Sequence, residues 1–294
     1  HSLPDWLKMR SGRVGVVTDG VAFPESGAQV RDLLRYASGC GAAVIPLGGG
    51  TSVVGHLTVP EGAQPVLTIN LSRLCGLVNL DHQAQLATFG AGVLGPDLEA
   101  QLRAQGYTLG HFPQSFEYST LGGWVVTRSS GQQSLRYGRI EQLFAGGTVE
   151  TPVGTLEVLP FPASAAGTDL REMVLGSEGR MGILTEATVR ITPLPQREEF
   201  HTLFFPDWEQ AQAAVRAIVQ AKLPLSMLRL SNPVETLTTL TMAGHKTLIG
   251  LLERYLAWRG CTDQKCMLMI GATGRGDTVA HALKSAQRIA RGYQ

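Results

Sequence analysis

Hydrophobic and polar positions alternate in short blocks that predict strands and helices in mixed order. Residues 14–17 and 43–46 are short runs rich in β-branched or apolar residues, so a strand is expected at each. Between them, Ser26 precedes apolar positions at helical spacing, which predicts a helix that begins after Ser26 and ends near Gly39 or Gly41. The first part of the chain therefore has the pattern strand, helix, strand.

The same pattern continues through the middle of the chain. Strands are expected over residues 66–70, 77–80, 85–89, 143–149, 155–159 and 182–191. The polar turn Asp81-His82-Gln83 predicts that two of these strands form a hairpin. Gly95-Pro96 is typical of a helix start and Gly106 of its end, and a further helix is expected from Ser119-Thr120 to Arg128.

Pro193 and Pro195 mark the expected boundary between two domains, residues 1–195 and 196–294. After the boundary the pattern predicts an α+β alternation of ferredoxin-like type. It consists of strands over 200–205, 225–230 and 266–270 and helices over 207–221 and 278–291. The pattern stops at Gln294 without a closing element, so the second domain is expected to be incomplete.

Composition narrows the class of protein. The 294 residues are 44% hydrophobic and 17% charged, which suits about two globular domains. The formal net charge is +1, so nothing favours nucleic acid, and no apolar run approaches the roughly 18 residues of a membrane span. The four cysteines are too few for a disulfide scaffold; Cys40 and Cys75 are expected to be buried thiols, and a cytoplasmic location is expected.

Glycine is the main anomaly, and its first cluster follows an expected strand. The segment is Pro46-Leu47-Gly48-Gly49-Gly50-Thr51-Ser52. Consecutive glycines let backbone N–H groups turn inward around an anion, and two hydroxyls follow. A Walker A loop needs a lysine here, and a Rossmann fingerprint needs a glycine at Val53. Alone, this loop suits a phosphate about as well as a tight turn that packs backbone on backbone.

Two further loops have related compositions. Residues 113–120 are rich in polar groups at an expected helix start, where backbone donors favour an anion. Gly122-Gly123 weakens that first turn, which suits either a ligand against it or a contact with a neighbouring strand. The third loop, residues 176–184, has three glycines, which suits a flat ligand or a β-turn. The histidines are scattered without a His-Glu-x-x-His or His-x-His pair, so no metal site is expected.

Taken together and in this order, the loops resemble the FAD-binding domain of the vanillyl-alcohol oxidase / p-cresol methylhydroxylase superfamily. The likeness is carried by Pro-x-Gly-Gly-Gly-Thr-Ser at 46–52 and Gly-Ser-Glu-Gly-x-x-Gly-Ile-x-Thr-Glu-Ala at 176–187. Within that superfamily, residues 110–131, with Tyr137-Gly138 and Ile140-Glu141, look most like the alkyldihydroxyacetonephosphate synthase family. The resemblance covers about residues 10–235.

The resemblance implies an α+β, PCMH-type FAD-binding fold of two α+β subdomains over 1–195. It also implies a partial ferredoxin-like substrate or cap domain over 196–294. The FAD is expected to be non-covalent, because the first loop has Thr51 where covalent members often have a histidine. The residues expected to contact FAD are Pro46, Leu47, Gly48, Gly49, Gly50, Thr51 and Ser52; Gln114, Ser115, Phe116, Glu117, Tyr118, Ser119, Thr120, Gly122, Gly123, Thr127, Arg128, Ser129 and Ser130; and Glu178, Gly179, Arg180, Met181, Gly182, Ile183 and Leu184.

Arg229 matches an active-site arginine of the alkyl synthase pattern and is the expected catalytic residue, although a strand-edge arginine in water is the alternative. The resemblance implies exchange at flavin N5 of the acyl group of acyl-dihydroxyacetone phosphate for an alkyl chain, without net redox change. Oxidation of a hydroxy acid or alcohol stays open, as does a flavin-binding module without activity of its own. The expected partner is a small-molecule substrate, with no nucleic acid and no integral membrane span, and a homodimer is left open.

Overall fold

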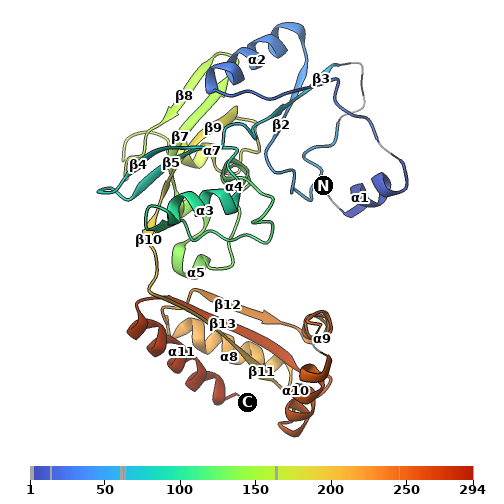
Figure 1. Ribbon diagram of the computed structural model, residues 1–294, viewed down its shortest axis with the longest axis vertical. Coiled ribbons are helices and arrows are strands. Elements are labelled where there is room, and N and C mark those ends of the chain that lie inside the picture. Colours follow the sequence, from blue (N-terminus) through green and yellow to red (C-terminus); the bar gives the residue numbers. More distant parts are fainter. Residues whose placement is uncertain are drawn as a thin grey trace. The chain divides into compact units, whose positions relative to one another are not determined.

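Separate hydrophobic cores divide the chain into two units. The structure, a computed structural model, describes residues 3–13, 15–59, 62, 64–162, 165–244 and 246–293. Unit 1 comprises His1–Gly131 and Gly138–Leu194, and unit 2 comprises Gln132–Tyr137 and Pro195–Gln294 (Figure 1). Each unit buries its own cluster of aliphatic and aromatic side chains.

Unit 1 begins with α1 (Leu3–Arg10) and a three-stranded parallel sheet in the order β1 (Gly20–Ala22), β3 (Val66–Asn70), β2 (Ala43–Leu47). Helix α2 (Gly27–Cys40) packs on β2 through a stripe of apolar residues at helical spacing. Ser26 caps it by accepting a hydrogen bond from Gln29 N, and Gly41 ends it at φ 71°. The strand expected over 14–17 is wrong for residues 15–17, which are irregular, and Val14 lies outside the described residues.

The larger sheet of unit 1 is antiparallel. Its order is β4 (Leu77–Asp81), β5 (Leu86–Gly90), β9 (Ile183–Arg190), β7 (Phe144–Thr151), β8 (Gly154–Val158). Helices α3 (Gly95–Arg103) and α4 (Leu121–Thr127) contribute Leu98 and Trp124 to the core that includes Phe89 and Phe144 of this sheet. The short elements are β6 (Tyr107–Thr108), α6 (Ile140–Leu143), α7 (Leu170–Val174) and β10 (Thr192–Pro193).

Unit 2 has a three-stranded antiparallel sheet in the order β11 (Arg197–Phe205), β13 (Cys266–Gly274), β12 (Met227–Ser231). Helices α8 (Trp208–Gln220) and α11 (Gly276–Arg291) bury one face of the sheet (Figure 1). This order and connectivity agree with the expected ferredoxin-like pattern. The segment with α5 (Ser134–Tyr137) belongs to this unit, because Thr273 Oγ1 donates to Gln133 Oε1 at 3.2 Å.

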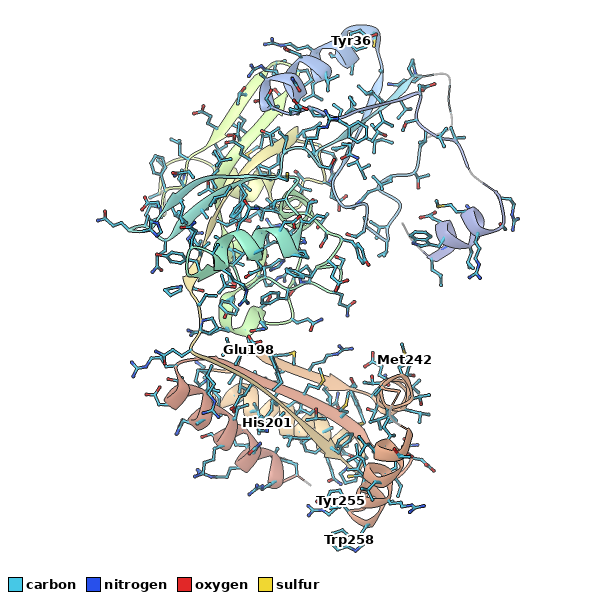
Figure 2. All side chains as sticks on the ribbon, viewed as in Figure 1. Tyr36, Glu198, His201, Met242, Tyr255 and Trp258 are labelled. Atoms are coloured by element: carbon cyan, nitrogen blue, oxygen red, sulfur yellow. The ribbon has the colours of Figure 1, made fainter. Side chains whose placement is uncertain are left out.

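Two helices of unit 2 were not expected from the sequence. Asn232 caps α9 (Pro233–Met242) by accepting from Glu235 N at 2.8 Å, and α10 (Lys246–Trp258) follows. Their apolar side chains are largely exposed; Met242 and Trp258 project from the ends of these helices (Figure 2). Because these positions do not mark a buried face, periodicity gives little help, but Asn-Pro before an acidic residue is a helix-start signal.

The expectation of buried thiols is wrong for both cysteines that it concerned. Cys40, at the last position of α2, and Cys75, just before β4, are exposed. Apolar neighbours in the sequence did not translate into burial, because both residues lie where an element meets solvent. Among the described residues, no helix is both long enough and apolar enough to cross a bilayer.

Candidate cofactor site

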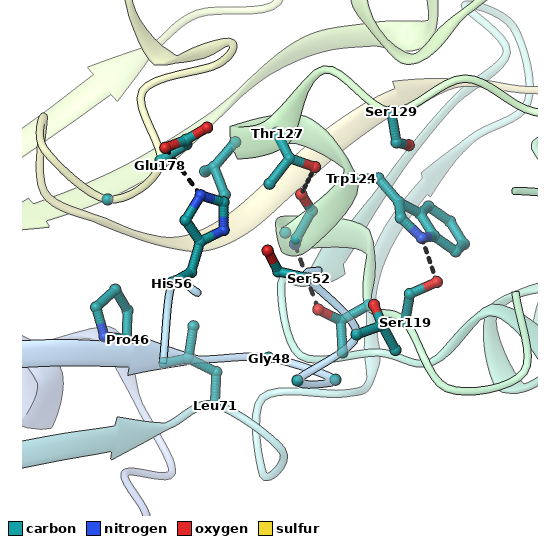
Figure 3. A pocket seen from close by; sticks show the side chains of 18 of the residues that line it. Pro46, Gly48, Ser52, His56, Leu71, Ser119, Trp124, Thr127, Ser129 and Glu178 are labelled. Atoms are coloured by element: carbon teal, nitrogen blue, oxygen red, sulfur yellow. Dashed lines mark hydrogen bonds and ion pairs between the residues drawn. The ribbon is translucent and has the colours of Figure 1, made fainter. Parts of the chain in front are cut away.

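The three glycine-containing loops meet around one cavity of unit 1 (Figure 3). The first loop follows β2, the second leads into α4, and the third leads into β9. The cavity has a volume of about 470 Å³, which lies within the usual size of small-molecule and cofactor pockets. Loops that are far apart in the sequence therefore form a single concave surface.

Contacts between the loops explain several of the glycines. A Cβ atom at Gly49 would lie 1.7 Å from Tyr118 O, and one at Gly48 would lie 2.4 Å from Thr120 Oγ1. The third loop approaches the first in the same way, since a Cβ at Gly179 would lie 2.9 Å from Pro46 Cγ. Gly49 brings backbone against backbone, while Gly48 and Gly179 let the loop backbone approach side chains of Thr120 and Pro46, so the absence of side chains at these glycines allows the loops to close around the cavity.

The first loop has unpaired hydrogen-bond donors. Within the described part of the chain, the amides of Gly49, Thr51 and Ser52 donate no hydrogen bond. Of the residues that the structure describes, neither a lysine nor an arginine lines the cavity. An oxyanion bound here would therefore be met by backbone amides and hydroxyls, as in other anion-binding backbone nests.

Helix α4 uses its paired glycines for two different purposes. Gly122 packs against Ala91, the residue that follows β5, since a Cβ added at Gly122 would lie 2.8 Å from the Cβ of Ala91. Gly123 lines the cavity, and its amide donates to Thr120 Oγ1, the helix N-cap, at 3.3 Å. Gly122 therefore fits the packing alternative, whereas Gly123 leaves the cavity side of the first turn without a side chain.

A histidine and a carboxylate meet on the cavity wall. Nε2 of His56 is 2.9 Å from Oε2 of Glu178, and both side chains are partly exposed (Figure 3). Glu178 has a left-handed backbone with φ 53°, and its amide donates to Val126 O at 2.9 Å. The backbone of the third loop is thus fixed on α4, while its carboxylate reaches the segment that follows the first loop.

A buried histidine lies behind the cavity. Nε2 of His111 is 2.7 Å from Oγ of Ser129, which lines the cavity, and the ring lies 5.0 Å from that of Trp124. Burial lowers the pKa of His111 to about 4, so the imidazole is neutral at physiological pH. Within the described residues, its Nδ1 has no hydrogen-bond partner.

The structure brings most of the predicted FAD contacts to the cavity and leaves others away from it. The lining includes Pro46, Gly48, Gly49, Gly50, Thr51, Ser52, Ser115, Ser119, Thr120, Gly122, Gly123, Thr127, Ser129, Glu178, Gly179, Gly182, Ile183 and Leu184. It does not include Leu47, Gln114, Phe116, Glu117, Tyr118, Arg128, Ser130, Arg180 or Met181.

Two of these nine residues have a clear physical reason for their placement. Arg128 ends α4 with φ 52°, and its guanidinium pairs with Glu172 at 2.5 Å. The ring of Phe116 packs against the rings of Phe112 and Trp124. Both side chains are therefore engaged by protein neighbours.

Sequence reasoning missed several residues of the cavity wall. They are Val53, Val54, His56, Leu57, Leu71, Trp124 and Val126. Two could have been found. Val126 follows Gly123 at helical spacing, and Leu71 follows β3, which pairs in parallel with β2 and so ends at the same sheet edge as the first loop.

Arg229 lies in unit 2, on the sheet face opposite α8 and α11. Its neighbours across the sheet are Met269, which pairs with Arg229, and Thr202, which pairs with Met269. In the adjacent row, the ring of Phe200 lies over Gly271, whose Cβ would be 2.5 Å from it. Arg229 is exposed and has no ion-pair partner among the described residues. One guanidinium thus lies among predominantly apolar neighbours.

The fold and the cavity between the three glycine-containing loops are those of a cofactor-binding protein, and the first loop is neither a Walker A nor a Rossmann loop. The sequence matches the FAD binding domain family over residues 18–159 and the C-terminal domain of FAD linked oxidases over residues 194–293. The chain therefore belongs to the FAD-linked oxidases, and its cofactor is FAD. The predicted fold class, family resemblance and cofactor are confirmed.

Individual relatives share this architecture. Alkyldihydroxyacetonephosphate synthase of Dictyostelium discoideum is 34% identical over 280 residues, which are 93% of this chain and 46% of that protein. A solved structure of an alkyldihydroxyacetonephosphate synthase superposes with a TM-score of 0.90 at 32% identity, covering 99% of this chain and 54% of that one. Glycolate oxidase subunit GlcD of Bacillus subtilis is 26% identical over 281 residues, 93% of this chain and 55% of that protein. The chain spans about half the length of these relatives.

Proposed function

We propose that unit 1 holds FAD non-covalently in the cavity of Figure 3. FAD carries a doubly charged diphosphate and a flat ring, and the unpaired amides of the first loop suit the diphosphate. Apolar side chains such as Val126 and Ile183 suit the ring. His56 is the histidine on this wall, and its pairing with Glu178 supports a dissociable flavin.

Denaturation separates the two modes of attachment. A non-covalent flavin appears in the supernatant after the protein is precipitated with acid, and the pellet is colourless. Yellow colour that stays with the pellet would contradict non-covalent attachment, and His56 would then be the residue to test for a covalent bond to the flavin.

In the proposed enzyme, residues 196–294 form the substrate domain and Arg229 binds the anionic group of the substrate. The position of Arg229 among Met269, Phe200 and Met227 is the observation that carries this proposal. Such a face suits a molecule with an anionic head and an apolar chain, because the guanidinium binds oxyanions and the apolar side chains exclude water.

The reaction that best fits such a substrate is that of the alkyldihydroxyacetonephosphate synthases, which the chain resembles over most of its length. In the exchange, the acyl–oxygen group of acyl-dihydroxyacetone phosphate leaves as a fatty acid, and a fatty alcohol supplies the new ether-linked chain. When bound, FAD supplies N5 chemistry. This chain's own residues hold the flavin and orient the substrate.

Oxidation of a hydroxy acid is the second candidate, because a glycolate oxidase subunit is also a relative. The two are distinguished by incubating the FAD-loaded protein anaerobically with acyl-dihydroxyacetone phosphate and a long-chain alcohol, or with glycolate or D-lactate. Alkyl-dihydroxyacetone phosphate formed with the flavin still oxidised at the end supports the proposal. Bleaching by a hydroxy acid without ether formation would overturn it, and a flavin inert in both assays would favour a binding module.

Two broader expectations accompany this proposal. The exposed free thiols of Cys40 and Cys75 support a reducing compartment such as the cytoplasm. Microscopy of the tagged protein tests that location. A homodimer stays a prediction that sedimentation would test.

A further inference from the structure

A second cavity, of about 460 Å³, lies in unit 2. Its lining comes from β11, α10 with the residue that follows it, and α11. The lining residues are Leu203, Tyr255, Arg259, Gln287 and Arg291. Two guanidinium groups, a phenol and an amide thus surround a space with one aliphatic residue, which is a lining rich in hydrogen-bond donors.

The two guanidinium groups are uncompensated. Among the described residues, the guanidinium of neither Arg259 nor Arg291 has an ion pair or a hydrogen bond. Nearby carboxylates are engaged elsewhere: Glu253 of α10 pairs with Lys265 at 3.2 Å, and Glu199 of β11 pairs with Arg197. Two like charges on one cavity repel each other, so an anion between them would be favoured.

The amide on the cavity wall is held in place. Gln287 Nε2 lies 3.1 Å from Nδ1 of His201, which comes from β11. Nδ1 accepts this hydrogen bond, because an amide nitrogen can only donate. One N–H of Gln287 remains available beside the two arginines.

An apolar stripe on α10 borders the cavity. Leu248, Leu251, Tyr255 and Trp258 follow one another at helical spacing, and each is more than half exposed. Tyr255 belongs to both features, and its ring lies 6.1 Å from that of Trp258 (Figure 2). A charged cavity that adjoins exposed aromatic residues suits the head of an amphiphile as well as a free anion.

We propose that Arg259 and Arg291 form a binding site for a phosphate monoester. At neutral pH such a group carries close to two negative charges and matches two guanidinium groups, whereas a carboxylate or a phosphodiester carries one. The monoester is supplied either by a soluble ester or by a lipid headgroup beside the α10 stripe. The site is defined by residues of unit 2 other than Arg229 and does not depend on the chemistry at the flavin.

Helix polarity alone offers a simpler account of these arginines. Arg291 is the last residue of α11 and Arg259 directly follows α10, and cations are favoured at helix C-termini. That account explains each arginine separately and predicts no binding site. The experiment must therefore distinguish the cavity from a generally basic surface.

The test uses the FAD-loaded chain and measures binding. Glycerol 3-phosphate is titrated by calorimetry, and vesicles of phosphatidylcholine with phosphatidic acid or with phosphatidylglycerol are sedimented with the protein. The double variant Arg259→Gln/Arg291→Gln should weaken monoester binding about tenfold or more. The matched control Arg254→Gln/Arg288→Gln removes equal charge from α10 and α11 outside the cavity lining, and its affinity should stay within about twofold of the wild type.

Binding of glycerol 3-phosphate supports a soluble ligand, and binding of phosphatidic acid vesicles alone supports a lipid headgroup. The site is overturned if the wild-type chain binds neither, if both double variants lose binding equally, or if phosphatidylglycerol binds as well as phosphatidic acid. Melting temperature and flavin content establish that the variants are folded.

Discussion

His56 and Glu178 meet at 2.9 Å on the cavity wall, although one follows the first glycine loop and the other belongs to the third. Among the described lining residues, they are the two with acidic or imidazole side chains. A lone carboxylate beside a diphosphate would repel it, and the contact with His56 Nε2 gives this carboxylate a hydrogen-bond donor on the cavity wall. The contact therefore joins the first and third loop regions and also places the Glu178 carboxylate on the cavity wall.

Replacing His56 alone should weaken FAD binding more than replacing both partners. His56→Gln removes the imidazole that contacts the Glu178 carboxylate, and a partly exposed pair of this kind accounts for about a three- to fivefold loss of affinity. Glu178→Gln should change affinity little, and the double variant should recover most of the loss. Fluorescence quenching during titration of apoprotein with FAD measures each value. A double variant as weak as His56→Gln would contradict this explanation.

A side chain at Gly49 should abolish flavin retention. The Cβ of Gly49→Ala would lie 1.7 Å from Tyr118 O, so the first two loops would have to separate, at a cost of about 2–4 kcal/mol in the free energy of unfolding. Flavin absorbance per protein and thermal unfolding measure both effects. Gly39→Ala is the control: no atom lies within 4 Å of its Cβ, and alanine in α2 should stabilise the helix by about 0.5–1 kcal/mol. Normal flavin content in Gly49→Ala would refute the role of this contact.

Local patterns predicted the elements that contain the site. Ser26 and Gly41 bound α2 because capping and left-handed glycine are short-range effects, and β3 spans the expected residues 66–70. The order of the glycine loops was also sufficient to indicate FAD. These signals depend on residues a few positions apart, which a single sequence displays directly.

Long-range contacts were not predictable in the same way. Arg128 was expected among the FAD contacts, but its guanidinium pairs with Glu172, which comes from a segment that the sequence around Arg128 does not indicate. His56 gave no sign of its partner Glu178, and Gln133 joins unit 2 through Thr273. Each of these outcomes depends on which segments pack together, and that information is absent from local spacing.

Arg229→Gln should reduce kcat/KM without changing flavin content. Loss of a charged hydrogen bond to the substrate should lower kcat/KM by about ten- to a hundredfold. Arg229→Lys should recover part of the loss, since it restores the charge without the planar fork. Arg216→Gln serves as the control. Arg216 is an exposed residue of α8, which covers the sheet face opposite Arg229, so its replacement should leave turnover unchanged. Equal activity of Arg229→Gln and the wild type would place substrate binding elsewhere.

The buried imidazole of His111 should make the fold sensitive to acid. Its pKa is about 4 in the folded protein and about 6.5 when unfolded, so only the unfolded chain takes up a proton between these values. Stability from this residue is complete above pH 6.5 and is lost as the pH falls toward 4, by about 2–3 kcal/mol.

The non-titrating variant His111→Asn isolates this contribution. At pH 7.5 it should be less stable than the wild type, because it loses the packing against Trp124. That deficit should shrink as the pH approaches 4.5, since the wild type alone pays the cost of keeping the imidazole neutral. Urea unfolding of the wild-type and variant apoproteins between pH 7.5 and pH 4.5 measures this difference in the free energy of unfolding. Ser129→Ala is the control, because it removes the 2.7 Å contact but keeps the buried ring, and its deficit should persist at low pH. A constant difference between His111→Asn and the wild type would show that the imidazole takes up a proton as readily in the folded as in the unfolded chain, and would contradict the lowered pKa.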